Sequence, residues 1–140
     1  MIYPIKEISD SLKRHEGYAQ HAYVCPAGAT SVGYGRNLDE KHGGLGISQE
    51  DAEYLLANDI KRSIEECERF GWWEDCPMDK RQVIIELCFQ MGWPSLTNFN
   101  RMLSHMAKQS YDLAAVELLD SRFARQVPHR AAELAERLRA

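Results

Sequence analysis

The stretch E-G-Y-A-Q-H-A-Y-V-C-P-A-G-A-T-S-V-G-Y-G-R, residues 16–36, decides the fold that the rest of the sequence indicates. Pro26-Ala27-Gly28 is a turn signal between two short β-prone runs, and it predicts a hairpin. Closely spaced glycines in the same stretch let the backbone turn tightly and approach a ligand closely. Because proline and these glycines do not suit long regular strands, we expect the β structure here to be small.

A short helix is predicted before this stretch. Ile5, Ile8 and Leu12 recur at helical spacing, and Gly17 is a typical residue just past a helix end. The helix should therefore end near Gly17 and place Glu16 in or just past its last turn.

Helical periodicity returns after residue 48 and continues to the end of the chain. One apolar stripe comprises Ala52, Leu55, Leu56, Ile60, Ile64 and Cys67, and it predicts the longest helix. A second stripe from Val83 to Met91 is apolar on most sides, which is typical of a buried central helix. Shorter helices are expected around residues 97–106, 112–119 and 128–138.

The order is one helix, a small hairpin lobe and five or so further helices. We therefore predict a mainly α-helical α+β protein, with a single domain over residues 1–140. The small lobe should span about residues 17–47, and the helical body residues 1–16 and 48–140. A cleft between the lobe and the body is the expected place for a site.

The bulk composition narrows the possible partners. The chain has 140 residues, of which 44% are hydrophobic and 27% charged, with a formal net charge of −4. No apolar run is long enough for membrane insertion. The negative net charge does not indicate the strongly basic surface that is typical of a nucleic-acid-binding protein. Because the N-terminus lacks a basic segment followed by a long apolar run, we expect no signal peptide and folding in the cytoplasm.

The four cysteines are expected to be reduced thiols. Cys25, Cys67, Cys76 and Cys88 form no C-x-x-C pair, and no histidine lies at zinc-finger spacing from them. We therefore expect no metal site and no cofactor, and we expect Cys67 and Cys88 to pack in the core.

A resemblance to a known family appears in the opening stretch. Its signature positions are Glu16-Gly17, Tyr23, Cys25, Gly28, Ser31, Gly33, Gly35 and Arg36. They resemble the pattern E-G-x5-Y-x-D-x2-G-x2-T-x-G-x-G-H of the T-even and lambdoid phage lysozymes, glycoside hydrolase family 24. Similar segments follow at residues 89–92, 97–103 and 121–130, so the resemblance covers the chain from about Leu12 to about Arg130.

The resemblance implies a lysozyme-like fold and a muramidase. Such an enzyme hydrolyses the β-1,4 bond between N-acetylmuramic acid and N-acetylglucosamine in bacterial peptidoglycan. Glu16 would be the general acid that protonates the glycosidic oxygen, and Arg130 matches a family arginine that pairs with this glutamate. The candidates for sugar contacts are Gln90, Thr97, Asn98 and Gln126, because polar side chains that both donate and accept suit hydroxyl and N-acetyl groups.

The family also implies how the protein reaches its substrate. We expect a monomer that accumulates in the host cytoplasm and reaches the cell wall or periplasm after release through a holin. A virion-associated lysozyme is the alternative.

Cys25 occupies the position where the family pattern has an aspartate. A thiol is mostly neutral at pH 7 unless its surroundings lower its pKa. Three readings follow: Cys25 acts as a thiolate base or nucleophile; Glu16 suffices alone, as in a lytic transglycosylase; or the protein is an inactive module that only binds peptidoglycan. We favour the first reading.

Ser31 replaces a family threonine that helps to place the attacking water, and it keeps the hydroxyl. Thr30 would take this role if the register shifted by one residue. We prefer Ser31 because strand neighbours face opposite ways and its spacing from Cys25 matches the family. Glu16, Cys25 and Ser31 should therefore converge on one cleft, with Arg130 close to Glu16. A Cys25 side chain that pointed into the helical core would contradict the base role.

Overall fold

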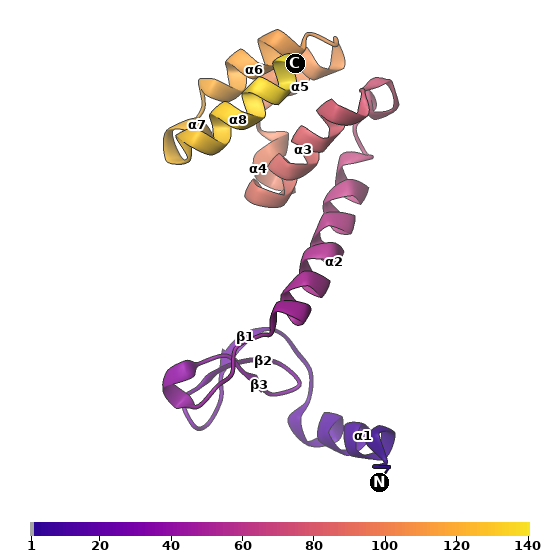
Figure 1. The fold of residues 1–140 in the computed structure, drawn as a ribbon, viewed down its shortest axis with the longest axis vertical. Helices are drawn as coiled ribbons and strands as arrows, with labels where there is room; N and C mark the ends of the chain where they lie inside the picture. Colours follow the sequence, from indigo (N-terminus) through magenta and orange to yellow (C-terminus); the bar gives the residue numbers. More distant parts are fainter. Residues whose placement is uncertain (1) are drawn as a thin grey trace. The chain divides into compact units, whose positions relative to one another are not determined.

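The computed structural model describes residues 2–140 and confirms the mainly helical α+β class (Figure 1). Within these residues, 65% of the chain is helical, with eight α-helices and one three-stranded antiparallel sheet. The chain forms two compact units, of which the first extends to Glu53 and the second comprises Tyr54–Ala140. The assignment of the whole chain to one domain stays a prediction.

The first unit contains one helix and the sheet. Its elements are α1 (Ile5–Glu16), β1 (Ala19–Val24), β2 (Thr30–Gly33), β3 (Arg36–Asn37) and the 3-10 turn η1 (Glu40–His42). Helix α1 ends where the sequence predicts, because Gly17 adopts φ 69° and its N–H donates to Lys13 O at 3.0 Å. A positive φ is a conformation that glycine adopts without the steric cost of a side chain.

The sheet has the order β1-β2-β3, so the predicted hairpin is present and carries one further short strand. Tyr23 lies opposite Ser31, and Ser31 lies opposite Asn37. The Leu38 N–H extends this pairing by donating to Thr30 O at 2.8 Å. The third strand could not be predicted from the sequence, because two residues are too few to show an alternating pattern.

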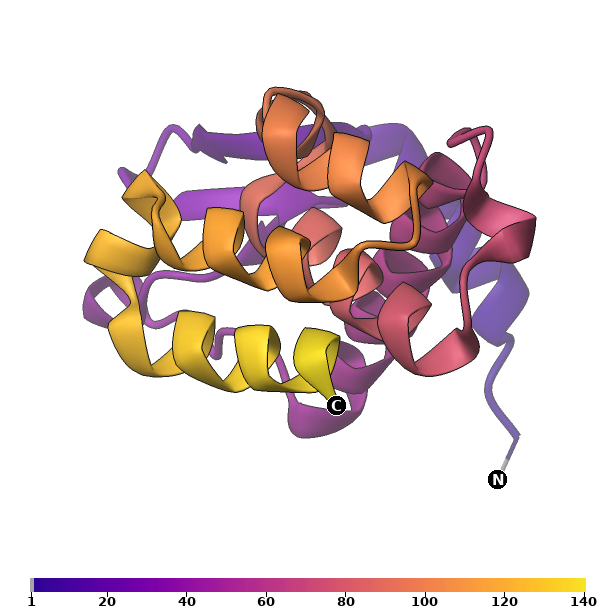
Figure 2. The same cartoon turned by 90° about the horizontal axis from the view of Figure 1, so that it is seen from above.

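The second unit is helical. It contains most of α2 (Gln49–Cys67), then η2 (Trp73–Asp75), α3 (Met78–Met91), α4 (Trp93–Thr97), α5 (Asn100–Ala107), α6 (Tyr111–Leu119), α7 (Arg122–Gln126) and α8 (Pro128–Arg139). In Figures 1 and 2, α8 runs beside α6, with which it shares the most contacts of any helix. The sequence did not predict α4 and α7 as separate helices, because five residues carry less than two turns of periodicity.

The hydrophobic core of the second unit forms around α3, which confirms the predicted central helix. Val83, Ile84 and Leu87 are fully buried, and α8 contributes Leu134 and Leu138. Cys67 and Cys88 are also buried in this core, as expected. No helix of residues 2–140 is both long and apolar enough to cross a membrane.

The apolar stripe of α2 predicts the longest helix correctly, and the structure shows that this stripe is only partly buried. Its buried residues are Ser63 and Cys67, whereas Leu56, Ile60 and Ile64 line an apolar groove beside α3. Ile85 and Phe89 form part of the other wall of this groove. Helical spacing identified the stripe correctly, but it could not show which part of the stripe would be enclosed.

Lys80 stabilises the end of α8, and its replacement by methionine should destabilise the protein. The buried ammonium donates to Arg137 O at 2.9 Å and to Ala140 O at 2.5 Å. Because methionine keeps the aliphatic chain but cannot donate, we expect Lys80→Met to lower the free energy of unfolding by about 1.5–3 kcal/mol. Urea denaturation measures this difference.

The matched control is Lys61→Met, at an exposed position on α2. A surface substitution should change the free energy of unfolding by less than about 0.5 kcal/mol. Equal effects of the two substitutions would show that the bonds from Lys80 contribute nothing specific.

Candidate functional site

Glu16, the last residue of α1, rests against the turn between β2 and β3. A Cβ atom added to Gly35 would lie 2.6 Å from Glu16 Oε2 and 3.0 Å from Glu16 Cδ. Real Cβ atoms do not approach other atoms so closely, so a side chain at residue 35 would force the exposed Glu16 carboxyl to move away from this turn. Gly35 also has φ +76°, a conformation that favours glycine independently of the contact.

Strand pairing explains why these two residues meet. Gly17 ends α1, and two residues later Ala19 pairs with Gly33 across the hairpin. The turn that follows Gly33 is thereby brought back to the end of α1. Nearby, the rings of Tyr18 and Tyr34 lie 5.6 Å apart, which adds a second contact between the same segments.

Cys25 begins a tight turn that joins β1 to β2. Its N–H donates to Ala29 O at 2.9 Å, and the Gly28 N–H donates back to Cys25 O at 2.8 Å. Gly28 has φ +89°, which the turn requires. The Cys25 side chain is partly exposed, and its neighbours belong to this turn rather than to the helical core.

The Cys25 thiol has a pKa below its ordinary value. The main cause is a hydrogen bond from the backbone of Ala29, with further hydrogen bonds from the backbone of Ala27 and from the Ser31 side chain. Partial burial opposes these bonds by penalising the charged form. The turn therefore favours the thiolate, the form that acts as a base or nucleophile.

Ser31 lies beside the thiol, in keeping with its spacing from Cys25. Its side chain is buried, and its hydroxyl donates to Ala29 O at 3.4 Å. Thr30 is exposed. The structure thus brings Cys25 and Ser31 together within the sheet that also carries Gly35, and their catalytic roles stay predictions.

Two of the predicted sugar-contacting residues share a hollow of about 440 Å³ in the second unit. Asn98 and Gln126 line it, and their neighbours there include Phe99, Ser121 and Phe123. Polar and aromatic side chains in one hollow suit a sugar, which has both hydroxyl groups and apolar ring faces. Thr97 is nearby in sequence. Its hydroxyl donates to Pro94 O at 2.9 Å within the same short helix, so its hydrogen already has a partner.

Gln90 and Arg130 line the apolar groove between α2 and α3. Within the second unit, Arg130 donates to Glu86 at 2.5 Å and lies 3.5 Å from Glu133. Arg137 donates to the other oxygen of Glu86 at 2.6 Å. The expected pairing of Arg130 with Glu16 would join the two units and stays a prediction.

Glu86 was not predicted as a residue of interest. The signal for it was available, because a carboxylate within the apolar run from Val83 to Met91 requires a charged partner when it is partly buried. Arg137 and Arg130 lower the pKa of this carboxyl, with Arg137 the larger contributor. Among residues 2–140, no group of three or more His, Cys, Asp or Glu side chains is placed to hold a metal ion.

The sequence matches the phage lysozyme family over residues 13–138. The match includes α1 from Lys13 onward, the whole sheet and nearly all of the second unit. No curated protein matches the sequence.

The Glu86 ion pairs should make stability depend on pH below the ordinary pKa of a glutamate. A carboxyl whose pKa is lower in the folded state stabilises the fold above its unfolded value of 4.5 and loses this contribution as pH falls through the folded value. We therefore expect Glu86→Gln to make the free energy of unfolding depend less steeply on pH in this acidic range. Urea denaturation at several pH values tests this.

The control for this comparison is Glu136→Gln, an exposed position on α8. It should keep the wild-type dependence on pH. An unchanged slope in Glu86→Gln would show that the two arginines do not stabilise the carboxylate in solution.

The contact between Glu16 and Gly35 predicts that Gly35→Ala impairs the site beyond its effect on stability. The added methyl group would push the Glu16 carboxyl away, and we expect about tenfold to hundredfold slower solubilisation of peptidoglycan. Alanine in the left-handed region also costs about 1–2 kcal/mol of stability.

Gly46→Ala separates these two effects. Gly46 has φ +65°, and an added Cβ would meet nothing within 4 Å. The two variants should lose similar stability, but only Gly35→Ala should lose activity. Equal activity would mean that the position of Glu16 does not depend on Gly35.

Proposed function

Because the chain belongs to the phage lysozyme family and is thereby a peptidoglycan-degrading enzyme, we propose that it is a muramidase. It hydrolyses the β-1,4 bond between N-acetylmuramic acid and N-acetylglucosamine. The observation that supports this proposal is the position of candidate residues at both ends of β2. Cys25 and Ser31 lie together beside the β1–β2 turn, and the Glu16 carboxyl at the end of α1 lies against the β2–β3 turn.

Glu16 is the general acid. Glycoside hydrolases need a carboxylic acid that protonates the leaving oxygen as the glycosidic bond breaks. Glu16 is exposed at the end of α1, so it is accessible to a polymer, and its contact with Gly35 limits the directions in which the carboxyl can point. Orientation of this kind is a main source of catalytic power.

Cys25 takes the place of the second carboxylate. Its thiolate accepts a proton from water while the water oxygen bonds to the anomeric carbon, and the proton of Glu16 goes to the leaving sugar oxygen. The lowered pKa of the thiol supports this role, because the thiolate fraction rises as the pKa approaches the working pH. Direct attack of the sulfur on the anomeric carbon is the variant of this role in which Cys25 is the nucleophile.

Ser31 positions the attacking water. Its single hydroxyl hydrogen is shared between Ala29 O and the Cys25 sulfur, and the oxygen lone pairs are left to accept a hydrogen bond from water. The side chain is buried, so its position varies little. A fixed acceptor beside the thiol is what a water molecule needs in order to point its own lone pair at the sugar.

The second unit supplies the sugar contacts in this proposal. Asn98 and Gln126 bind hydroxyl or N-acetyl groups in their shared hollow, with Phe99 and Phe123 available to pack against a ring face. Gln90, Thr97 and Arg130 complete the contacts that we propose. The protein acts as a monomer that is made in the host cytoplasm and is released to the cell wall through a holin.

A lytic transglycosylase is the second candidate, and the thiol at position 25 is the observation that favours it. In that reaction the 6-hydroxyl of the muramic acid attacks its own anomeric carbon, so no external water and no second carboxylate are needed. Glu16 would then act alone. A module that binds peptidoglycan without cleaving it is the remaining alternative.

Digestion of purified peptidoglycan distinguishes these reactions. Wild type, Glu16→Gln, Cys25→Ser and Cys25→Asp are compared, and the released muropeptides are identified by mass spectrometry. We expect wild type to release products with free reducing ends. Glu16→Gln should lower the rate by about 10²–10⁴-fold, since general acid catalysis contributes this much, and Cys25→Ser should also lower it strongly.

The Cys25→Asp variant is the most informative part of this experiment. Cys25→Asp restores a carboxylate base and should retain activity, whereas serine is neither a base nor a strong nucleophile at neutral pH. Anhydro-muramyl products with full activity in Cys25→Ser would instead establish the transglycosylase. If the folded wild type releases nothing over a range of pH, the remaining interpretation is a protein that binds peptidoglycan without cleaving it.

A further inference from the structure

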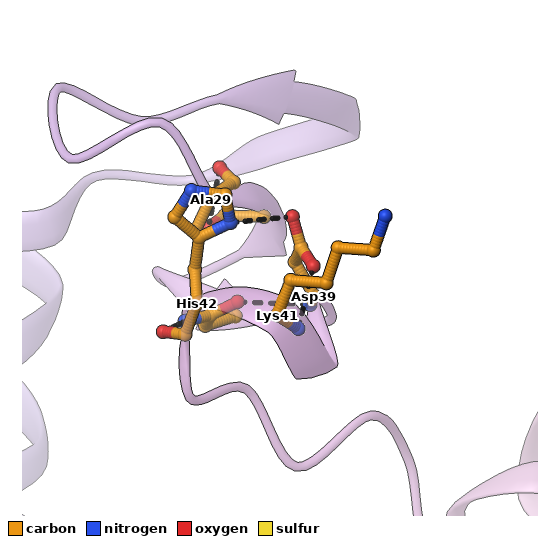
Figure 3. Close-up of polar contacts among 6 residues, drawn as sticks. Ala29, Asp39, Lys41 and His42 are labelled. Carbon is orange, nitrogen blue, oxygen red and sulfur yellow. Dashed lines mark hydrogen bonds and ion pairs between the residues drawn. The ribbon is translucent and has the colours of Figure 1, made fainter.

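Two buried thiols of the second unit lie side by side and have no part in the candidate site. The polar side chains beside the sheet satisfy one another, since Asp39 accepts from the Lys41 N–H at 2.9 Å and bonds to His42 Nδ1 at 2.8 Å (Figure 3). Cys67 on α2 and Cys88 on α3 are instead free cysteines within the hydrophobic core. Two thiols that meet across a helix pair can react with one another, which a lone buried cysteine cannot.

Several contacts bring the two sulfur atoms together. The Cys67 thiol donates to Ile84 O at 4.0 Å, and Ile84 lies one helical turn before Cys88. The Cys67 thiol is also shared with the Cys88 sulfur, which accepts from the Ser63 hydroxyl as well. Cys88 in turn donates to Glu66 Oε1 at 3.9 Å. Three residues at the end of α2 therefore meet α3 at the same place.

This place is where α2 is packed most closely. The buried residues of α2 are Ser63 and Cys67, whereas Leu56 and Ile60 line the open apolar groove. A covalent bond from Cys67 to α3 would therefore form at the part of α2 that already lies in the core, and it would restrain the rest of the helix.

We propose that Cys67 and Cys88 form a modification site, a dithiol that a small-molecule disulfide oxidises to a cross-link fixing the end of α2 to α3. In a reducing compartment the pair stays as thiols, and in an oxidising compartment the disulfide forms. This proposal does not depend on the muramidase function, because neither thiol belongs to the candidate site.

The hollow beside Cys88 sets the order of the steps. Cys88 lines a hollow of about 450 Å³ together with Glu66 and Trp93, whereas Cys67 is fully buried. Cys88, as the thiolate, attacks one sulfur of the reagent disulfide and expels one reagent thiolate, which leaves a mixed disulfide. Cys67, as the thiolate, then attacks the Cys88 sulfur and expels the second reagent thiolate. The two protons from the protein go to the expelled thiolates, so the dithiol is oxidised and one reagent disulfide is reduced.

The rate of this reaction should depend on pH. Burial raises the pKa of both thiols, so the thiolate is scarce at neutral pH. Because the thiolate is the attacking form, we expect cross-linking to become up to about tenfold faster for each unit of pH. Cys25 has a pKa below its ordinary value and should react with the same reagent sooner.

The test treats folded wild type with hydroxyethyl disulfide and maps the products. Free thiols are then blocked with N-ethylmaleimide, and cleavage by trypsin after lysine and arginine places the four cysteines in different peptides. We expect mass spectrometry of the unreduced digest to show the Cys67 peptide joined to the Cys88 peptide. Cys76 is the matched internal control, because it is buried too but neighbours Tyr111 rather than a thiol, and it should stay unlinked.

Three results would overturn the proposal. One is a mixed disulfide that stays on Cys88 without a cross-link, because the two sulfur atoms then do not meet. Another is complete reaction of Cys25 at alkaline pH while Cys67 and Cys88 remain unmodified. The third is a cross-link that appears only after urea has unfolded the protein.

Thermal unfolding provides the second readout, in a Cys25→Ser background that lacks the exposed thiol. The cross-link closes a loop of about 20 residues, and we expect the oxidised protein to melt about 5–15 °C above the reduced protein. A further Cys88→Ala substitution should remove this difference, and Cys67→Ala replaces it if that variant does not fold. Cys76→Ala should keep the difference. Equal melting temperatures of the oxidised and reduced forms in the Cys25→Ser background would contradict the proposal that the cross-link fixes α2 to α3.

Discussion

The absence of a side chain at residue 35 is the constraint on which the arrangement of the candidate site depends. The Glu16 carboxyl lies against the β2–β3 turn in space that a side chain at residue 35 would need, and Gly35 leaves this space open. The same residue needs a left-handed backbone, which glycine adopts at little cost. One glycine thus lies between the helix that carries Glu16, the proposed acid, and the sheet that carries Ser31.

The two units are stabilised by different kinds of interaction. The second unit has a continuous hydrophobic core around α3, in which leucine, isoleucine and alanine side chains of several helices are fully buried. The first unit encloses few side chains, notably Ala29 and Ser31, and is held by strand pairing, tight turns and the side-chain network of Asn37, Asp39 and His42. Directional hydrogen bonds specify geometry more narrowly than apolar burial does, which suits the segment that we propose to carry the reacting groups.

A thiol in place of a carboxylate changes what the surroundings must provide. A carboxylate is ionised at neutral pH without assistance, whereas a thiol needs hydrogen bonds to its charged form. The turn from Cys25 to Ala29 supplies such bonds, and Ser31 adds another. The backbone conformation of this turn therefore has a chemical consequence in this protein that it would not have beside an aspartate.

The sequence by itself determined the fold class, the central helix α3, the end of α1 at Gly17 and the family, because these depend on local periodicity, on glycine and on the spacing of a motif. It also pointed to Ser31 rather than Thr30, since strand neighbours alternate in direction. Only the tertiary structure showed the contact of Glu16 with Gly35 and the ion pairs of Glu86. These contacts join residues between 19 and 51 positions apart in the sequence, and no local pattern records which distant residues will meet once the strands pair and the helices pack.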